Sequence, residues 1–583
     1  LTEEDARLVL KEAHQFAMDV IGPTMSAADR DGCQLTPDGV KAPKVLHSVW
    51  KRYFESGWQA VALPESRGGM GAPLMLSAAV GEMLSGANTA FHMYPGLTMA
   101  AAGIIAALGT PEQKELYSSK LESGEWGGTM VLTEPSAGSD VGLSTTRAVR
   151  NDDGTFSIAG NKIFISGGDH DMADNIVHLA LARIEGAPKG SRGLSLFIIP
   201  KIRVNADGSL GEPNDVVCTH VEEKLGIHGS ATCALAFGEN GGCIGHLLGG
   251  EPKHGDQPGA GMRKMFMMMN GARIGVGTQS LAVASTAYYN ALEYARTRLQ
   301  GAHYSDGRPE KGAVPIIEHP DVRRMLLEMK SRVEGCRALL YSVVRKVDEA
   351  STLEKNDPEA AEALQDYLGL FIPLVKAHIS DESVAVSSLG LQVFGGAGYT
   401  KDFPAEQYYR DSRIFPIYEG TNGIQALDLV GRKLAQSGGA LVQRFVKELG
   451  ELAGDLSGRE GYERESKLLG ESQAALQTVL KAFMEFLTSG RQEQILLFGT
   501  PFQEMMGKIV CACLLLEGAL TAEAGLESTS EESRDRDFYR GKIAAARYYT
   551  RNVLPSVVGA AEIIAAGDDT AMHIPNAGYS LSY

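Results

Sequence analysis

The sequence has no excess of basic charge. Across its 583 residues, 72 Asp and Glu outnumber 55 Lys and Arg, which gives a formal net charge of −17. Because nucleic acids and many membrane surfaces are anionic, this balance argues against a general affinity for either. We therefore expect no nucleic-acid partner and no membrane partner.

Paired cysteines and long apolar runs are also missing. The seven Cys residues are scattered, and Cys511 and Cys513 lack the second pair that would complete a zinc site. The His residues show no metal-ligand spacing, and no apolar run approaches the roughly 20 residues that a membrane span needs. The opening LTEEDARLVLKEAHQF is acidic and lacks the basic and apolar regions of a signal peptide. These features predict a cytoplasmic protein with reduced thiols and no metal site.

The length predicts several structural units. A chain of 583 residues exceeds what one hydrophobic core usually holds, so three or four units are expected. Segments with helical periodicity flank a stretch of short, β-branched runs separated by Gly, Asp and Asn. We predict a mainly α-helical protein with a central β-domain, divided into a helical domain (1–125), the β-domain (126–256), a second helical domain (257–434) and a C-terminal helical extension (435–583).

Local signals place several helices within these regions. Thr110-Pro111-Glu112-Gln113 predicts a helix start in which the Thr and Gln side chains cap each other's backbone. Apolar residues from Ile274 to Ala295 fall on one helical stripe. Helical pattern continues through Val322–Val347 and Ala360–Leu389.

Four stretches between Met130 and Thr421 carry a more specific pattern. They are Met130–Asp140 (MVLTEPSAGSD), Ile163–Gly168 (IFISGG), Tyr294–Arg298 (YARTR), and a segment with QVFGGAGY at 392–399, Arg410-Asp411 and IYEGT at 417–421. Each stretch alone is weak evidence. In this order they resemble the acyl-CoA dehydrogenase family, whose TEPxAGSD motif the first one matches. The resemblance covers residues 1–434, and residues 435–583 resemble the helical extension of the larger members.

The resemblance implies FAD-dependent α,β-dehydrogenation of an acyl-CoA, with Glu419 as the base that removes the α-proton. A carboxylate is a weak base for a carbon acid. It removes the proton efficiently only where it is shielded from water and held in a fixed orientation towards the carbon. Glu419 follows Ile417-Tyr418, and such apolar neighbours should raise its pKa. An alternative is that Glu419 pairs with a nearby arginine at the surface. Some family members place the base instead on the helix that begins near Asn270, but in this sequence that stretch, Met269–Arg273, contains no carboxylate.

Further roles are implied by position in the family motifs. Gly420 lets the backbone approach the substrate closely. The simpler interpretation of Ser139 is a turn residue, and that of Arg298 is a solvated residue at a helix end. The implied substrate-binding residues are Ser139, Arg273 and Gly420. The implied FAD-binding residues are Met130, Leu132, Thr133, Phe164, Ile165, Ser166, Arg298, Gln392, Phe394, Gly395, Gly396, Thr421, Asn422 and Gln425, of which Arg298 and Gln392–Gly396 would reach the FAD of a neighbouring subunit.

Three other functions can be weighed against this one. Gly395–Gly398 could cradle a diphosphate, but no strand or βαβ unit surrounds it, which argues against an NAD-binding Rossmann enzyme. An acyl-CoA oxidase would share the fold and the base but reduce oxygen. DNA-binding flavoproteins of this fold use a basic C-terminal region, whereas residues 435–583 hold 14 basic and 20 acidic residues.

The acyl chain is the hardest property to predict. The segments Lys224–Ser230 and Phe266–Arg273 resemble bacterial members that convert 3-methylmercaptopropionyl-CoA to methylthioacryloyl-CoA in dimethylsulfoniopropionate breakdown. A general medium- or long-chain dehydrogenase of β-oxidation is the alternative. The resemblance also implies a homodimer with an electron-transfer flavoprotein as acceptor.

Overall fold

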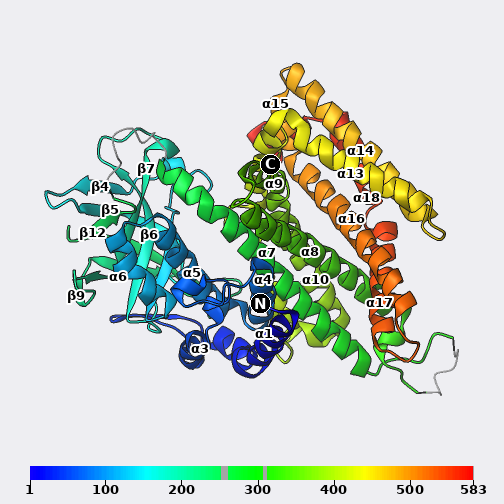
Figure 1. The fold of residues 1–583 in the computed structure, drawn as a ribbon, viewed down its shortest axis with the longest axis horizontal. Helices are drawn as coiled ribbons and strands as arrows, with labels where there is room; N and C mark the ends of the chain where they lie inside the picture. Colours follow the sequence, from blue (N-terminus) through cyan, green and yellow to red (C-terminus); the bar gives the residue numbers. More distant parts are fainter. Residues whose placement is uncertain (251–259, 306–311, 582–583) are drawn as a thin grey trace. The chain divides into compact units, whose positions relative to one another are not determined.

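The computed structural model describes residues 1–250, 260–305 and 312–581, with the backbone alone for residues 260–269. The chain divides into two compact units, Leu1–Ala282 and Val283–Tyr583. Helices dominate the chain, and every described strand lies in the first unit (Figure 1). The mainly helical fold with a central β region is therefore confirmed, whereas the finer division at residues 126, 257 and 435 stays a prediction.

The first unit begins with helices. The cap predicted at Thr110 is present: its Oγ1 accepts from Gln113 N at 3.2 Å, and Gln113 Oε1 accepts from Thr110 N at 3.1 Å. A short hairpin, β1 (Gln34–Thr36) and β2 (Gly39–Lys41), interrupts the region expected to be helical throughout. The helices are α1 (Glu3–Phe16), α2 (Met25–Asp31), α3 (Lys44–Glu55), α4 (Leu74–Ala87), α5 (Thr89–Leu108), α6 (Pro111–Glu122) and the first part of α7 (Ala260–Thr297).

An eight-stranded sheet forms the centre of the first unit. Its order is β10-β11-β5-β12-β7-β6-β3, and β4 pairs with β5 and β6. The pairs β3–β6 and β4–β6 are parallel and the others are antiparallel. The strands are β3 (Trp126–Val131), β4 (Arg147–Arg150), β5 (Phe156–Ser166), β6 (Asn175–Ile184), β7 (Leu194–Pro200), β10 (Val216–Val221), β11 (Thr232–Phe237) and β12 (Ile244–Leu247), and β8 (Ile202–Val204) with β9 (Leu210–Pro213) forms a separate hairpin.

Helix α5 packs directly on strand β3. The contact is close because Gly128 has no side chain: a Cβ there would lie 2.8 Å from the Cβ of Ala101. The Gly128 N–H also donates to Thr98 Oγ1 at 3.0 Å. This contact fixes the strand that leads into the MVLTEPSAGSD segment.

The second unit is an array of helices. The expected helical stretch 360–389 is two helices, because Gly369 ends the first and Pro373 lies in the first turn of the second. The helices after α7 are α8 (Pro320–Leu353), α9 (Pro358–Leu368), α10 (Ile372–Phe394), α11 (Ala405–Ser412), α12 (Asn422–Asp428), α13 (Ala440–Ser457), α14 (Glu463–Thr488), α15 (Gln492–Leu497), α16 (Gly499–Ser528), α17 (Asp535–Asn552), α18 (Ser556–Ala566) and α19 (Thr570–His573).

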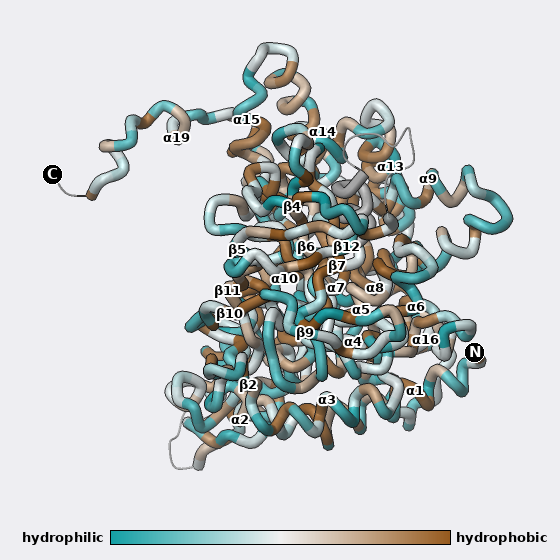
Figure 2. The backbone as a smooth tube through the Cα atoms, turned by 90° about the vertical axis from the view of Figure 1, so that its left-hand side faces the viewer, coloured by the Kyte–Doolittle hydropathy of each residue, from teal (hydrophilic) through white to brown (hydrophobic). Residues whose placement is uncertain are grey.

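The extension 435–583 packs on the other helices of this unit. Helix α16 contacts α8, α10 and α12, and α17 contacts α8 (Figure 1). Two glycines permit the close approach, since a Cβ at Gly335 would lie 3.2 Å from Cys511 Cβ and one at Gly507 would lie 2.3 Å from His378 Cγ. After α18 the chain continues as an arm of mostly exposed residues (Figure 2).

Two helices are more apolar than the sequence pattern suggested. Thr89–Leu108 and Gly499–Ser528 are long and apolar enough to cross a membrane by length and composition, so the expectation that no apolar run approaches that length is wrong. Burial explains their composition, because half of the apolar window of the first and 44% of that of the second are buried.

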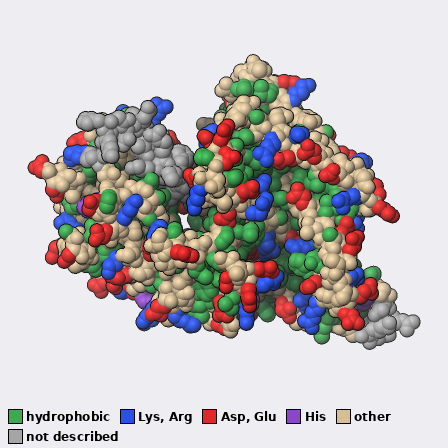
Figure 3. Space-filling view, in the orientation of Figure 1, with side chains coloured by type: hydrophobic (Ala, Val, Ile, Leu, Met, Phe, Trp, Pro, Cys, Tyr) green, Lys and Arg blue, Asp and Glu red, His purple; other side chains and the backbone are tan. Residues whose placement is uncertain are grey.

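On the face drawn in Figure 3, acidic and basic side chains are interspersed.

Candidate active site

The first predicted group lies where β3 ends. Met130 is buried in the strand, and Leu132 and Thr133 follow it half-buried. The chain then turns back on itself, with Glu134 and Ala137 exchanging two backbone hydrogen bonds of 3.0 Å. Ser139 comes after this turn and is exposed. The turn thus presents the polar end of the segment at the surface of the unit.

The second predicted group lies at the end of β5, next to the first. Ile163 N donates to Thr133 O at 2.9 Å, which joins the two segments. Phe164 has a left-handed backbone (φ 60°) and the residue is 59% exposed, whereas Ile165 is buried. Ser166 ends the strand half-buried. The structure therefore brings Met130–Thr133 and Phe164–Ser166 together beside an exposed aromatic ring.

A buried ion pair underlies this junction, and the sequence analysis missed it. Lys162 Nζ lies 2.9 Å from Glu134 Oε1 and donates to Leu132 O at 2.9 Å. The Glu134 carboxylate accepts four more hydrogen bonds of 2.6–3.1 Å from the backbone and hydroxyl groups of Thr145 and Thr146. Burial alone would favour the neutral acid, but these donors and the Lys162 charge lower the pKa of Glu134 to about 2.

A signal for this pair exists in the sequence. Lys162 stands on the inward face of β5, in alternation with buried Phe156 and Ile158. A lysine on that face needs a buried acceptor, and Glu134 of the TEP motif is that acceptor. The pair fixes the segment that carries Leu132 and Thr133.

Arg273 is the remaining predicted residue of the first unit. It lies on α7 and is 4% exposed. The methionines just before it, up to Met269, belong to the stretch whose side chains lie outside the described residues.

Glu419 lies in the second unit, in a turn between Phe415 and α12. Glu419 and Gly420 are both left-handed (φ 55° and 78°), and Glu419 is one of few non-glycine residues in that region. Such a conformation costs about 1–3 kcal/mol and persists only where the surroundings hold it. Glu419 is half-buried. The nearby Arg410 forms an ion pair with Glu406, with Nε 2.5 Å from Oε2.

The residues after this turn hold it in place. Thr421 caps α12, its Oγ1 accepting from Ile424 N at 3.2 Å. The fully buried Gln425 reaches back and donates from Nε2 to the carbonyl oxygens of Glu419 and Gly420 at 3.4 and 3.3 Å. The Asn422 side chain points inward to α10, where Lys376 Nζ donates to its Oδ1 at 2.8 Å. The Asn422 amide and Gln425 Nε2 are thus used within the unit, whereas Gln425 Oε1 has no hydrogen-bond partner among the described residues.

The predicted subunit-bridging residues are mostly at the surface of the second unit. Arg298, Gln392, Gly395 and Gly396 are exposed, and a Cβ at either glycine would meet no atom within 4 Å. Phe394 differs, because the residue is 6% exposed and its ring stacks on that of Tyr294 with centroids 4.2 Å apart. Helix α10 ends at Phe394, so the glycines follow a helix end and belong to no βαβ unit.

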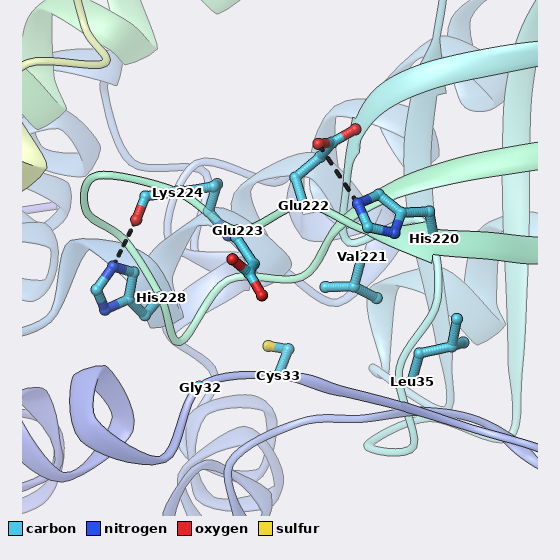
Figure 4. Close-up of a pocket in the computed structure, with 9 residues that line it drawn as sticks. All are labelled: Gly32, Cys33, Leu35, His220, Val221, Glu222, Glu223, Lys224 and His228. Atoms are coloured by element: carbon cyan, nitrogen blue, oxygen red, sulfur yellow. Dashed lines mark hydrogen bonds and ion pairs between the residues drawn. The ribbon is translucent and has the colours of Figure 1, made fainter.

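A hollow in the first unit contains none of the predicted site residues. Its volume is about 340 Å³. Figure 4 shows its lining, which comes from the chain around Cys33 and from the segment between His220 and His228. His228 Nε2 lies 2.8 Å from Lys224 O, and His220 Nε2 lies 3.7 Å from Glu222 Oε2. Within the described part of the chain, no group of three or more His, Cys, Asp or Glu residues is placed to hold a metal ion. All seven Cys residues are free thiols.

Four family models match successive parts of the chain. They are described as the N-terminal, middle and C-terminal domains of acyl-CoA dehydrogenase, at residues 3–125, 129–239 and 259–434, and as an acetyl-CoA dehydrogenase C-terminal-like domain at residues 440–575.

Curated relatives match almost the whole chain. A 3-methylmercaptopropionyl-CoA dehydrogenase of Ruegeria pomeroyi is 39% identical over 554 residues, which cover 94% of this chain and 90% of the relative. A butyryl-CoA dehydrogenase of Syntrophomonas wolfei is 37% identical, over 96% of this chain and 91% of the relative. A solved acyl-CoA dehydrogenase of Bacillus anthracis, complexed with FAD, has the same fold with a TM-score of 0.77 at 21% identity, over 98% of this chain and 90% of that one.

Proposed function

The chain belongs to the acyl-CoA dehydrogenase family, and from that premise we propose that Glu419 removes the α-proton of an acyl-CoA thioester. The observation that carries the assignment is the turn at Glu419 and Gly420. Its left-handed backbone is held by the Thr421 cap and the Gln425 amide. A fixed, half-buried carboxylate suits a base that must meet a carbon acid in one orientation.

FAD is the cofactor, and it supplies the acceptor for the β-hydride when bound. The chain offers a suitable surface in its first unit: the exposed Phe164 ring stands beside the hydroxyl-bearing residues Thr133 and Ser166. The ring suits a flat aromatic system, and the hydroxyls suit its polar edge. In the second unit, Gly395 and Gly396 leave open space that a diphosphate could approach through backbone groups.

The substrate is a short acyl-CoA, and 3-methylmercaptopropionyl-CoA is our specific proposal. Its support is the Ruegeria relative, with 39% identity over nearly the full length including the extension. The butyryl-CoA relative at 37% supports a short chain of similar size. On the side of CoA, Ser139, Arg273 and Gly420 are the proposed contacts. A medium- or long-chain dehydrogenase remains the second candidate, and an oxidase the third.

A homodimer and an electron-transfer flavoprotein complete the proposal, with the cytoplasm as location. The exposed Arg298 and Gln392 support the dimer, because both stand at the surface where a second copy could meet them. Light scattering tests it: a monomer would contradict the shared FAD site. Rapid reaction of the reduced enzyme with oxygen would favour the oxidase instead.

The Glu419→Gln variant tests the base. It should keep FAD and bind acyl-CoA, but the rate at which substrate bleaches the flavin should fall by roughly 10²–10⁴-fold. Glu451→Gln is the control, because Glu451 is exposed and pairs only loosely with Lys447 at 3.3 Å. Near-normal bleaching in Glu419→Gln, measured by stopped-flow absorbance, would end the assignment.

A further inference from the structure

The turn at Glu419 needs an external support. Two successive left-handed residues, one of them a glutamate, are not a conformation the chain adopts unaided. The amide of Gln425 holds both carbonyl oxygens of the turn, and Gln425 itself belongs to α12. The position of α12 therefore sets the position of the turn.

Helix α12 is fastened on one side to α10. Asn422, its first residue, donates from Nδ2 to Ala377 O at 3.1 Å and to Asp381 Oδ1 at 2.8 Å. Its Oδ1 accepts from Lys376 Nζ at 2.8 Å and from Ser380 Oγ at 3.2 Å. Asn422 is 8% exposed, so these bonds lie out of water and hold the start of α12 in one place.

The second fastening comes from the C-terminal extension. Gln503 of α16 donates from Nε2 to Asn422 O at 3.3 Å and is 2% exposed. Helices α16 and α12 are in contact here, and a Cβ at Gly499 would lie 3.6 Å from Ala426 Cβ, an ordinary van der Waals distance. Among the described residues, Gln503 Oε1 has no hydrogen-bond partner. A buried polar atom left without a partner is costly, so shape alone does not explain a glutamine at this position.

We infer that Gln503 is a positioning residue for the proton-abstraction step, through which the extension holds α12 and hence the Glu419 turn. The inference rests on the proposed role of Glu419. It gives residues 435–583 a part in the reaction: the extension does not touch the substrate but limits where the base can stand. A displacement of about 1 Å at a reacting group can lower a rate by about 10²-fold.

Two variants of Gln503 and a matched control test this. Gln503→Met keeps the length of the side chain without its donor, and Gln503→Asn keeps the amide but draws it back from Asn422. Gln494→Met is the control: Gln494 lies in the same extension, is also 2% exposed and also has an unpartnered Oε1, but its Nε2 donates to Gly567 O and Asp569 Oδ2. Holoenzymes are compared in stopped-flow flavin reduction with butanoyl-CoA and with its α-deuterated form.

Both Gln503 variants should reduce their flavin roughly 10-fold or more slowly than wild type. The KM should not change, and the α-deuterium isotope effect should be larger, because proton abstraction is the step disturbed. Gln494→Met should melt at a lower temperature, as Gln503→Met does, yet reduce its flavin at the wild-type rate. Wild-type rates in the Gln503 variants, or an equal loss in Gln494→Met, would overturn the inference while leaving Glu419 as the base. A wild-type enzyme that no acyl-CoA bleaches would overturn the proposed function itself, and this inference with it.

Discussion

Lys162 of β5 forms an ion pair with Glu134 in the turn after β3, with Lys162 Nζ 2.9 Å from Glu134 Oε1. Their side chains are 0% and 1% exposed. The same Nζ donates to the carbonyl of Leu132, the residue before Thr133. One ammonium group therefore fixes both the acid of the TEP motif and the backbone beside the proposed flavin-binding hydroxyl.

Lys162→Met should destabilise the first unit strongly. Removing one partner of a buried ion pair leaves an uncompensated charge, which costs roughly 3–5 kcal/mol. The double variant Glu134→Gln/Lys162→Met should lose less than the sum of the single losses. Urea unfolding of the three variants measures the coupling. Arg7→Met is the control, because the Arg7–Glu3 pair is 77% and 80% exposed and should contribute nothing measurable. Additive losses in the double variant would contradict a coupled pair.

The pH dependence of stability should carry a contribution from Glu134. Its pKa is lowered to about 2 in the folded protein from an ordinary value of 4.5, so the unfolded chain binds more protons between these values. The stabilisation is therefore present above about pH 4.5 and is lost as the pH falls towards about 2. In Glu134→Gln, thermal unfolding should follow a shallower pH dependence across this window. A curve parallel to that of wild type would show that Glu134 does not contribute.

Short sequence patterns predicted the structure of the residues that form them. They did not predict contacts between residues that are far apart in the sequence. The Thr110 cap needs four consecutive residues and was predicted correctly. Helical periodicity predicted α8 correctly. It did not predict the break at Gly369, because a single glycine did not interrupt the long apolar pattern. Asn422 and Gln503 lie 81 positions apart and meet only because α12 and α16 pack together.

The candidate site shows the same limit. Motif matching predicted Thr133 and Ser166 as flavin-binding residues. In the structure their two segments lie side by side, joined by the hydrogen bond from Ile163 N to Thr133 O. Motif matching could not show that the Asn422 side chain faces α10, because a motif position does not state which atoms point where. The partner of Lys162 on β5 could have been predicted from the sequence, because a charged side chain on the buried face of a strand needs a partner of opposite charge.

Gly507→Ala should loosen the extension from α10. A Cβ there would lie 2.3 Å from Cγ of His378, whose ring is buried, so the helices must separate. Such overpacking costs about 1–3 kcal/mol. Gly518→Ala is the control, because it lies in the same helix with no atom within 4 Å of the added Cβ, and alanine there should be neutral or stabilising by up to about 1 kcal/mol. Thermal unfolding of both variants tests this prediction. Equal melting temperatures would contradict a tight contact between Gly507 and His378.

The order of reactivity among acyl-CoA thioesters tests the substrate proposal. Replacing a methylene by sulfur leaves 3-methylmercaptopropionyl-CoA close in shape to pentanoyl-CoA. An apolar pocket discriminates such near-isosteres by roughly 10–200-fold at most. Pentanoyl-CoA and butanoyl-CoA should therefore be oxidised measurably, in keeping with the 39% and 37% identical relatives named for the two short substrates.

Palmitoyl-CoA should be poor, because a chain that overfills a short pocket costs about 1–3 kcal/mol or more. The measurement is kcat/KM for each thioester with an artificial electron acceptor, so that the natural acceptor does not bias the order. Glu419→Gln, assayed by binding alone, controls for thioesters that bind without reacting. If palmitoyl-CoA has the highest kcat/KM, the enzyme belongs to long-chain β-oxidation and the short-chain proposal is wrong. The role of Glu419 would survive that outcome, because the base meets the α-carbon whatever the length of the chain beyond it.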